Sequence, residues 1–182
     1  MNMKIFLSVF FILCLTACSL IENIRTGKDE MASEMSQGIA AFDMTNYQAA
    51  LHHFASPAEY GDIDAQYMIG MIHMYGLAGN KNTYMAQKWL LLAAEGGQKA
   101  AQEQLAFLYR DELAPLYDPI NAYRWFRVVV QDKPEHLQKL QNLEWTLRSR
   151  GWLSTAQSSI PRPKEKLYKG LELNYNSLFP LR

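Results

Sequence analysis

Apolar side chains recur every three or four residues through most of this chain, which is the spacing of one face of an α-helix. The pattern is clearest between Ala65 and Gly97, where two amphipathic segments flank a turn rich in glycine and asparagine. The second segment ends in Ala-Ala-Glu-Gly-Gly, which is typical of a helix that stops at glycine. This stretch is therefore predicted to form two antiparallel helices.

The same residue types return at a fixed offset of 36 positions (101 − 65). The matched pairs are Ala65 and Ala101, Ala86 and Ala122, and Trp89 and Trp125. A fixed offset of this size with helical periodicity inside it indicates a helical-hairpin repeat. A shorter unit precedes it, with Asn46 predicted to cap its second helix and Pro57 to break or kink that helix.

The unit from Ala65 to Gly97 resembles the Sel-one-like repeat, a tetratricopeptide relative with a longer turn between its helices. The residues that carry the likeness are Ala65-Gln66-Tyr67, Ile69-Gly70, Gly76, Ala86, Trp89 and Ala93-Ala94-Glu95. The unit departs from the repeat at His73, Ala78 and Asn82, although Asn caps a helix about as well as Asp. The resemblance implies an all-α, short right-handed solenoid of antiparallel helical hairpins, in which the first helix of each hairpin lines the concave surface.

The third unit is predicted to end the array. Asp118-Pro119 is a strong helix start, but Lys133 stands where the closing glycine is expected. A further amphipathic helix from about Asp132 to Gly151 has the pattern of a capping helix, with one face on the last repeat. We therefore expect about three repeats plus a C-terminal capping helix within residues 35–152. The tail, residues 153–182, is expected to be partly ordered, with docking on the solenoid, disorder and partner binding as alternatives.

The N-terminus has the features of a lipoprotein leader. Lys4 precedes an apolar run that ends in Leu15-Thr16-Ala17-Cys18, which resembles a bacterial lipobox. Residues 1–17 are thus predicted to be a signal peptide and Cys18 to be the lipidated residue, with an ordinary signal peptide as the alternative. Residues 18–34 would form a tether. By resemblance to enterobacterial sorting, Ser19 favours the outer membrane, with the protein facing the periplasm of a Gram-negative bacterium.

Charge and composition restrict the remaining chemistry. The 182 residues include 18 basic and 18 acidic side chains, which does not fit a nucleic-acid binder. After cleavage and lipidation, neither Cys14 nor Cys18 would supply a thiol. Of the four histidines, His53 occupies a tryptophan position of the repeat and His73 a tyrosine position, so both are interpreted as packing residues. We expect no catalytic residue, metal, cofactor or small-molecule substrate.

One feature exceeds what the repeat needs, because the segment Ala65–Tyr75 is apolar nearly all round and rich in methionine. Met71 corresponds to Phe107, and Met74 to Arg110, at the same offset of 36. Ordinary core packing is one interpretation. The other is an adaptable groove for a partner peptide, formed by Met68, Met71, Met74, Phe107 and Arg110.

These features together predict a membrane-anchored adaptor that holds or assembles a protein complex of the cell envelope. Its partners would be envelope proteins, and the lipid would be its contact with the membrane. Two alternatives remain open at this stage. One is a pilot-like chaperone for a single outer-membrane client, and the other is an enzyme that acts on the cell wall or on a β-lactam, although related solenoids with such activity typically have paired cysteines.

Overall fold

The computed structural model describes residues 27–158, and every element within that range is helical. Cys18 and the tail from residue 159 onward lie outside the described residues. The helices are residues 27–43, α2 (Tyr47–Glu59), α3 (Ile63–Tyr75), α4 (Thr83–Glu95), α5 (Lys99–Arg110), α6 (Pro119–Val129), the 3-10 helix η1 (Pro134–His136), α7 (Leu137–Ser149) and α8 (Leu153–Ser158). The predicted all-α fold is confirmed for this part of the chain.

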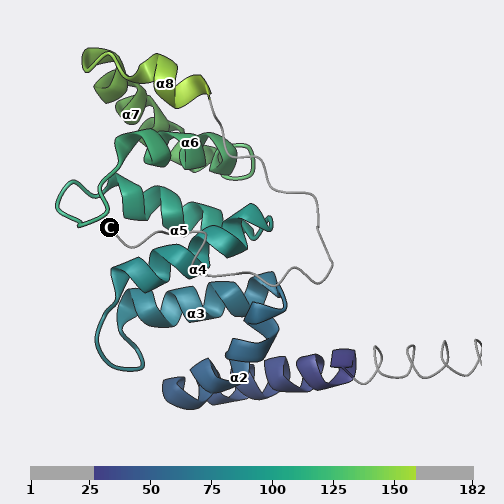
Figure 1. Cartoon of the computed structure of the whole chain (residues 1–182). Helices are drawn as coiled ribbons and strands as arrows, with labels where there is room; N and C mark the ends of the chain where they lie inside the picture. The colour runs from purple at the N-terminus through teal and green to yellow at the C-terminus, as the bar shows by residue number, and fades with distance from the viewer. Residues whose placement is uncertain (1–26, 159–182) are drawn as a thin grey trace, which may run out of the picture.

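The helices stack in the order of the sequence, from the N-terminal pair at one end to α8 at the other (Figure 1). Each helix packs chiefly against its neighbours in the chain, and α8 also packs on α6 and α7. This arrangement is that of a solenoid, in which each unit contacts only adjacent units. None of the described helices has the length and apolar character needed to cross a bilayer.

Equivalent hydrogen bonds recur in the structure at the same offset of 36 residues that the sequence shows. The side-chain amide of Gln66 donates to the carbonyl of Ala58 at 2.9 Å, and that of Gln102 donates to Ala94 at 3.1 Å. Both glutamines are buried, so these bonds satisfy groups that would otherwise be costly to bury. The backbone N–H of Asn82 likewise donates to His73, and that of Asp118 to Tyr109. Equivalent residues thus hold equivalent joints in successive hairpins.

The predicted helix starts are confirmed at Asn46, Asn82 and Asp118. In each case the side-chain oxygen accepts a hydrogen bond from a backbone N–H in the first turn of the following helix. Such a cap satisfies a donor that has no partner inside the helix. Pro57 lies near the end of α2, where the helix continues only to Glu59.

Small residues allow the helices of a hairpin to approach closely, and Gly70 shows why. A Cβ atom at this position of α3 would lie 2.8 Å from Cγ of Leu90 on α4. Leu90 is fully buried, and its backbone nitrogen would also lie 3.3 Å from the added atom, so a shift of the side chain alone would not remove the crowding. Alanine normally stabilises a helix relative to glycine, but here the steric clash outweighs that gain.

The end of the array differs from the prediction in detail. The segment after Lys133 begins as the 3-10 helix η1, because Lys133 offers no side-chain acceptor to cap an α-helix. On α7, Leu143 and Leu147 are buried, whereas Leu137 and Trp145 are exposed. The buried face of the predicted capping helix therefore includes Leu143 and Leu147 but not Leu137 or Trp145.

Two segments extend the helical packing beyond the predicted repeat domain. Residues 27–34, which we assigned to the tether, belong to the first helix. At the other end, α8 occupies the first residues of the predicted tail and buries Ala156. The guanidinium of Arg124 on α6 donates to the carbonyl of Thr155 at 3.2 Å, which fixes α8 in place.

Candidate partner-binding face

The predicted partner-binding residues on α5 lie at the surface. Phe107 is partly exposed and Arg110 is exposed, and the guanidinium carbon of Arg110 lies 5.2 Å from the centre of the Phe107 ring. Met71, the equivalent of Phe107 on α3, is also partly exposed. We call the surface formed by Met71, Phe107, Arg110 and the nearby residues of η1 and α7 the first-helix face.

The other two predicted methionines have a different role. Met74 is only 9% exposed and belongs to the core cluster that joins the second and third hairpins. Met68 packs against the core cluster of the N-terminal hairpins. Met74 thus contributes mainly to the core, although it also lines the larger of the two hollows described below.

Phe107 is held by two ring contacts across helices. Its ring meets that of Phe126 on α6 edge-on at 5.5 Å and that of His136 on η1 at 5.4 Å. Phe126 is fully buried and His136 is nearly so. Edge-to-face contacts of this kind stabilise and orient aromatic rings. These contacts orient the ring of Phe107, which we call the aromatic platform.

A charged network surrounds this platform. Glu103 on α5 accepts a hydrogen bond from the amine of Lys133 and pairs with Nε2 of His136 at 2.5 Å. The amine of Lys139 lies 3.1 Å from the other ring nitrogen of His136, Nδ1, and 5.7 Å from the Phe107 ring centre. These side-chain contacts link α5 to η1 and α7 on the first-helix face.

The network sets the electrostatics of Glu103. Burial by itself would raise the pKa of this carboxyl, but hydrogen bonds from Lys133 and His136, together with their charges, lower it below its ordinary value of 4.5. The hydrogen bond to Glu103 raises the pKa of the Lys133 amine in turn. On α3, burial first and then the charges of Tyr75 and Glu103 raise the pKa of Tyr67. At neutral pH Glu103 and Lys133 thus form an ion pair.

Sequence reasoning did not single out this network. Its partners are 30 or more positions apart, so no local spacing joins them. One signal was present, because Glu103 occupies the position of Tyr67 in the preceding unit. A charged residue at a packing position of the repeat indicates a compensating charge on the neighbouring hairpin.

The histidines predicted to pack do lie partly buried. Burial lowers the pKa of His73, while His53 bonds through Nδ1 to the carboxylate of Glu34 at 2.8 Å. That contact links α2 to the helix of residues 27–43. Across residues 27–158, no three side chains of His, Cys, Asp or Glu come together as metal ligands would.

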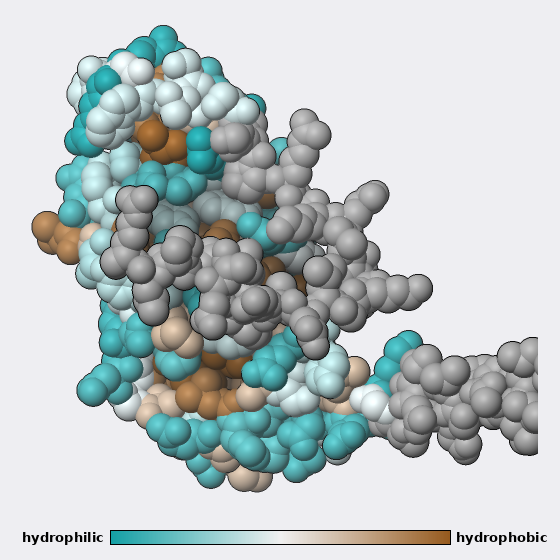
Figure 2. All heavy atoms as spheres, in the orientation of Figure 1, coloured by the Kyte–Doolittle hydropathy of each residue, from teal (hydrophilic) through white to brown (hydrophobic). Residues whose placement is uncertain are grey.

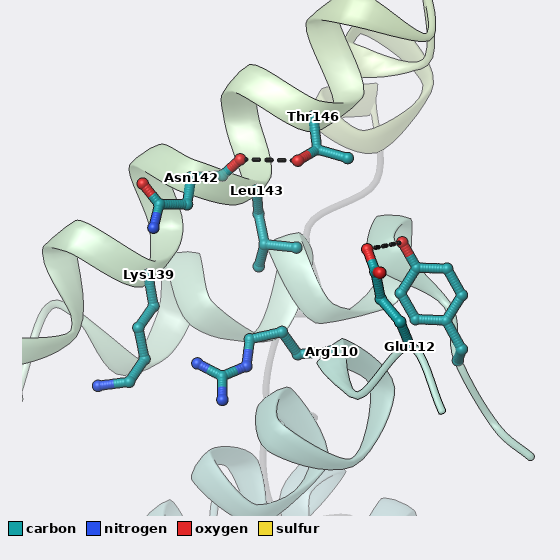
Figure 3. Close-up of a pocket in the computed structure, with 7 residues that line it drawn as sticks. Arg110, Glu112, Lys139, Asn142, Leu143 and Thr146 are labelled. Atoms are coloured by element: carbon teal, nitrogen blue, oxygen red, sulfur yellow. Dashed lines mark hydrogen bonds between the residues drawn. The ribbon is translucent and has the colours of Figure 1, made fainter. Parts of the chain in front are cut away.

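Two hollows lie on this part of the surface, and Phe107 lines the larger of them. The smaller, of about 180 Å³, is lined by Arg110 and by Lys139 and Asn142 of α7 (Figure 3). The larger, of about 390 Å³, is lined by Phe107, Met74 and residues of the two inter-helix turns, among them Leu113, which is 96% exposed. Hydrophobic patches interrupt the hydrophilic surface of the view in Figure 2. The first-helix face can therefore offer both charged and apolar contacts.

Replacing Glu103 with glutamine is expected to lower the free energy of unfolding by about 1–2 kcal/mol at pH 7, because the nearly buried His136 loses its carboxylate partner. The pKa of Glu103 is lower in the folded chain than in the unfolded chain, so its stabilisation is present at neutral pH and is lost as the pH falls through that lowered value. Urea unfolding at pH 7 and pH 3 should show a difference between wild type and E103Q that shrinks on acidification.

Glu144→Gln is the matched control. Glu144 pairs with Arg148 on the exposed side of α7, and such pairs contribute about 0.5 kcal/mol or less. A gap between wild type and E103Q that stays constant from pH 7 to pH 3 would contradict the assigned network.

The fold and the repeated hydrogen bonds together define this chain as a helical-repeat protein built from antiparallel helical hairpins. No family model matches the chain. It is 28% identical over 117 residues to alginate biosynthesis protein AlgK of Pseudomonas syringae pv. tomato. The match covers 64% of this chain and 24% of AlgK, so the chain spans about a quarter of the length of this relative.

Proposed function

We propose that this protein is a lipid-anchored, non-enzymatic adaptor that presents a helical-repeat surface to a protein partner in the cell envelope. The observation that carries the proposal is the first-helix face. There the aromatic platform, a partly exposed methionine and two cations lie at the surface beside two hollows. Adaptable apolar side chains next to charged ones suit the recognition of a peptide segment.

The similarity to AlgK supports an envelope role. AlgK is named for alginate biosynthesis, and the export of a polysaccharide is one of the processes that such an adaptor could serve. The predicted lipobox at Cys18 supports attachment to a membrane, and Ser19 supports the outer membrane. The lipid would keep the repeat surface at the periplasmic side, where assembly partners are available.

Affinity purification from detergent-solubilised envelopes, combined with deletion of the coding sequence, tests this proposal. An adaptor should retain several components of one complex, and its deletion should reduce all of them together. Mislocalisation of a single outer-membrane protein would favour the pilot-like chaperone instead. Turnover of peptidoglycan by the purified chain, abolished by one substitution, would contradict a non-enzymatic role.

A further inference from the structure

Two cationic side chains share one aromatic ring on the first-helix face. The guanidinium carbon of Arg110, at the end of α5, lies 5.2 Å from the centre of the Phe107 ring. The amine of Lys139, on α7, lies 5.7 Å from the same centre. Both residues also line the same hollow, so an anion bound there would be attracted by two positive charges.

Neither cation has a carboxylate partner within residues 27–158. Three other basic side chains at this end of the molecule do have one, since Lys99 pairs with Asp132, Lys133 with Glu103, and Arg148 with Glu144. Arg127 and Arg150 also have no carboxylate partner in this range, but each lies over a separate aromatic ring, whereas Arg110 and Lys139 share one. The polar contact of Lys139 is with His136, whose other ring nitrogen already faces Glu103. Arg110 and Lys139 therefore keep their charges available to a ligand.

A further donor lies in the same hollow. The side-chain oxygen of Asn142 accepts a hydrogen bond from Gln138 at 3.1 Å, which leaves its amide NH₂ without a partner in the described part of the chain. Figure 3 shows Arg110 and Lys139 on one side of the hollow, and Glu112 beside a tyrosine on the other side. That carboxylate lies 3.4 Å from the hydroxyl of Tyr117, which donates to it.

The size of the hollow limits what it can hold. About 180 Å³ is smaller than the roughly 300–1,000 Å³ typical of small-molecule sites, but it accommodates the end of one side chain. The larger hollow, of about 390 Å³, is lined by apolar residues that include Phe107 and Leu113, together with polar ones such as Lys81 and Asp111. Arg110, which lines the smaller hollow, lies over the Phe107 ring. One extended segment could thus place an acidic side chain in the first hollow and an apolar side chain in the second.

We propose that the two hollows bind an extended segment of a protein partner in which an acidic side chain lies close to an apolar one. The carboxylate accepts hydrogen bonds from Arg110 and Lys139 and from the amide of Asn142. The apolar side chain packs against Phe107. This inference rests on the proposed adaptor function and adds to it the chemistry of the segment that is recognised.

The test uses the purified full chain in detergent and a fluorescein-labelled decapeptide that contains four glutamates and two phenylalanines. Fluorescence anisotropy should show binding that weakens as salt is raised, because exposed charges are screened. Substitutions R110Q and K139Q should each weaken binding about tenfold, since each removes a charged hydrogen-bond donor. R110K keeps the charge and should retain most of the affinity.

Matched controls separate this site from general attraction to positive charge. R148Q removes an exposed cation that is already paired with Glu144, so it should leave the affinity unchanged. A peptide with glutamine in place of glutamate should bind at least about tenfold more weakly. Circular dichroism of each variant should match wild type, because Arg110 is exposed and glutamine at position 139 can still donate to His136.

Equal binding of the glutamine peptide, equal binding by the variants, or no binding at millimolar peptide would overturn the inference. Tighter binding of an alginate oligosaccharide than of the peptide would also overturn it, in favour of an acidic polysaccharide. A separate result tests the adaptor function. If a partner is cross-linked at Met71 while the acidic peptide does not bind, the adaptor stands and the charge assignment is wrong.

Discussion

Replacing Phe126 with alanine is expected to lower the free energy of unfolding by about 3–5 kcal/mol, the largest stability effect of any single change considered for this chain. The Phe126 side chain is fully buried, and its ring contacts Phe107 and His136. Its loss leaves a cavity beneath the platform and removes two ring contacts. Urea unfolding of the full chain, followed by circular dichroism, measures the change.

The control for Phe126 is Trp145→Ala. Trp145 is a larger aromatic residue on the neighbouring helix α7, but it is 73% exposed, so its removal should change the free energy of unfolding by no more than about 0.5 kcal/mol. If the free energies of unfolding of the two variants differ by less than about 1 kcal/mol, the assignment of Phe126 to the core is wrong.

Replacing Cys18 with serine is expected to abolish incorporation of an alkyne-labelled fatty acid and to remove the protein from the outer-membrane fraction. If Cys18 carries the lipid as the sequence predicts, a serine hydroxyl cannot replace its thiol as the acceptor. Each buried methylene contributes roughly 0.8 kcal/mol of membrane affinity, so the loss of several acyl chains removes the anchor. Labelling in cells, followed by density-gradient separation of the two membranes, measures both effects.

Cys14→Ser is the matched control because Cys14 lies within the apolar run of the predicted signal peptide. This variant should be labelled and sorted like wild type. Label that persists in C18S, or a wild-type protein that takes up none, would show that the lipobox assignment is wrong.

The joints of the repeat could be predicted from the sequence because they are local or recur at a fixed offset. Asn46, Asn82 and Asp118 cap the helices that follow them, as their positions indicated. The recurrence of Gln66 at Gln102 reflects the same buried side-chain bond in successive hairpins. Such features depend on a few neighbouring residues, so the sequence pattern contains them.

The charged part of the first-helix face could not be predicted in the same way. Lys133 and His136 reach Glu103 only because the third hairpin and η1 pack together, and no spacing along the chain encodes that contact. The burial of Met74 also depends on the third hairpin. Because α3 is apolar on nearly all sides, its sequence does not show which side is covered. In both cases the deciding interaction lies between repeats.

The central claim is that the first-helix face docks a protein partner, and site-specific photo-crosslinking in cells tests it most directly. A photoreactive residue placed at Met71, which is partly exposed on that face, should give a discrete adduct with one envelope protein, identified by mass spectrometry. The same residue at Tyr84, 62% exposed on the second helix α4 of the hairpin, should give none. No adduct at Met71, or the same adducts from both positions, would contradict the account.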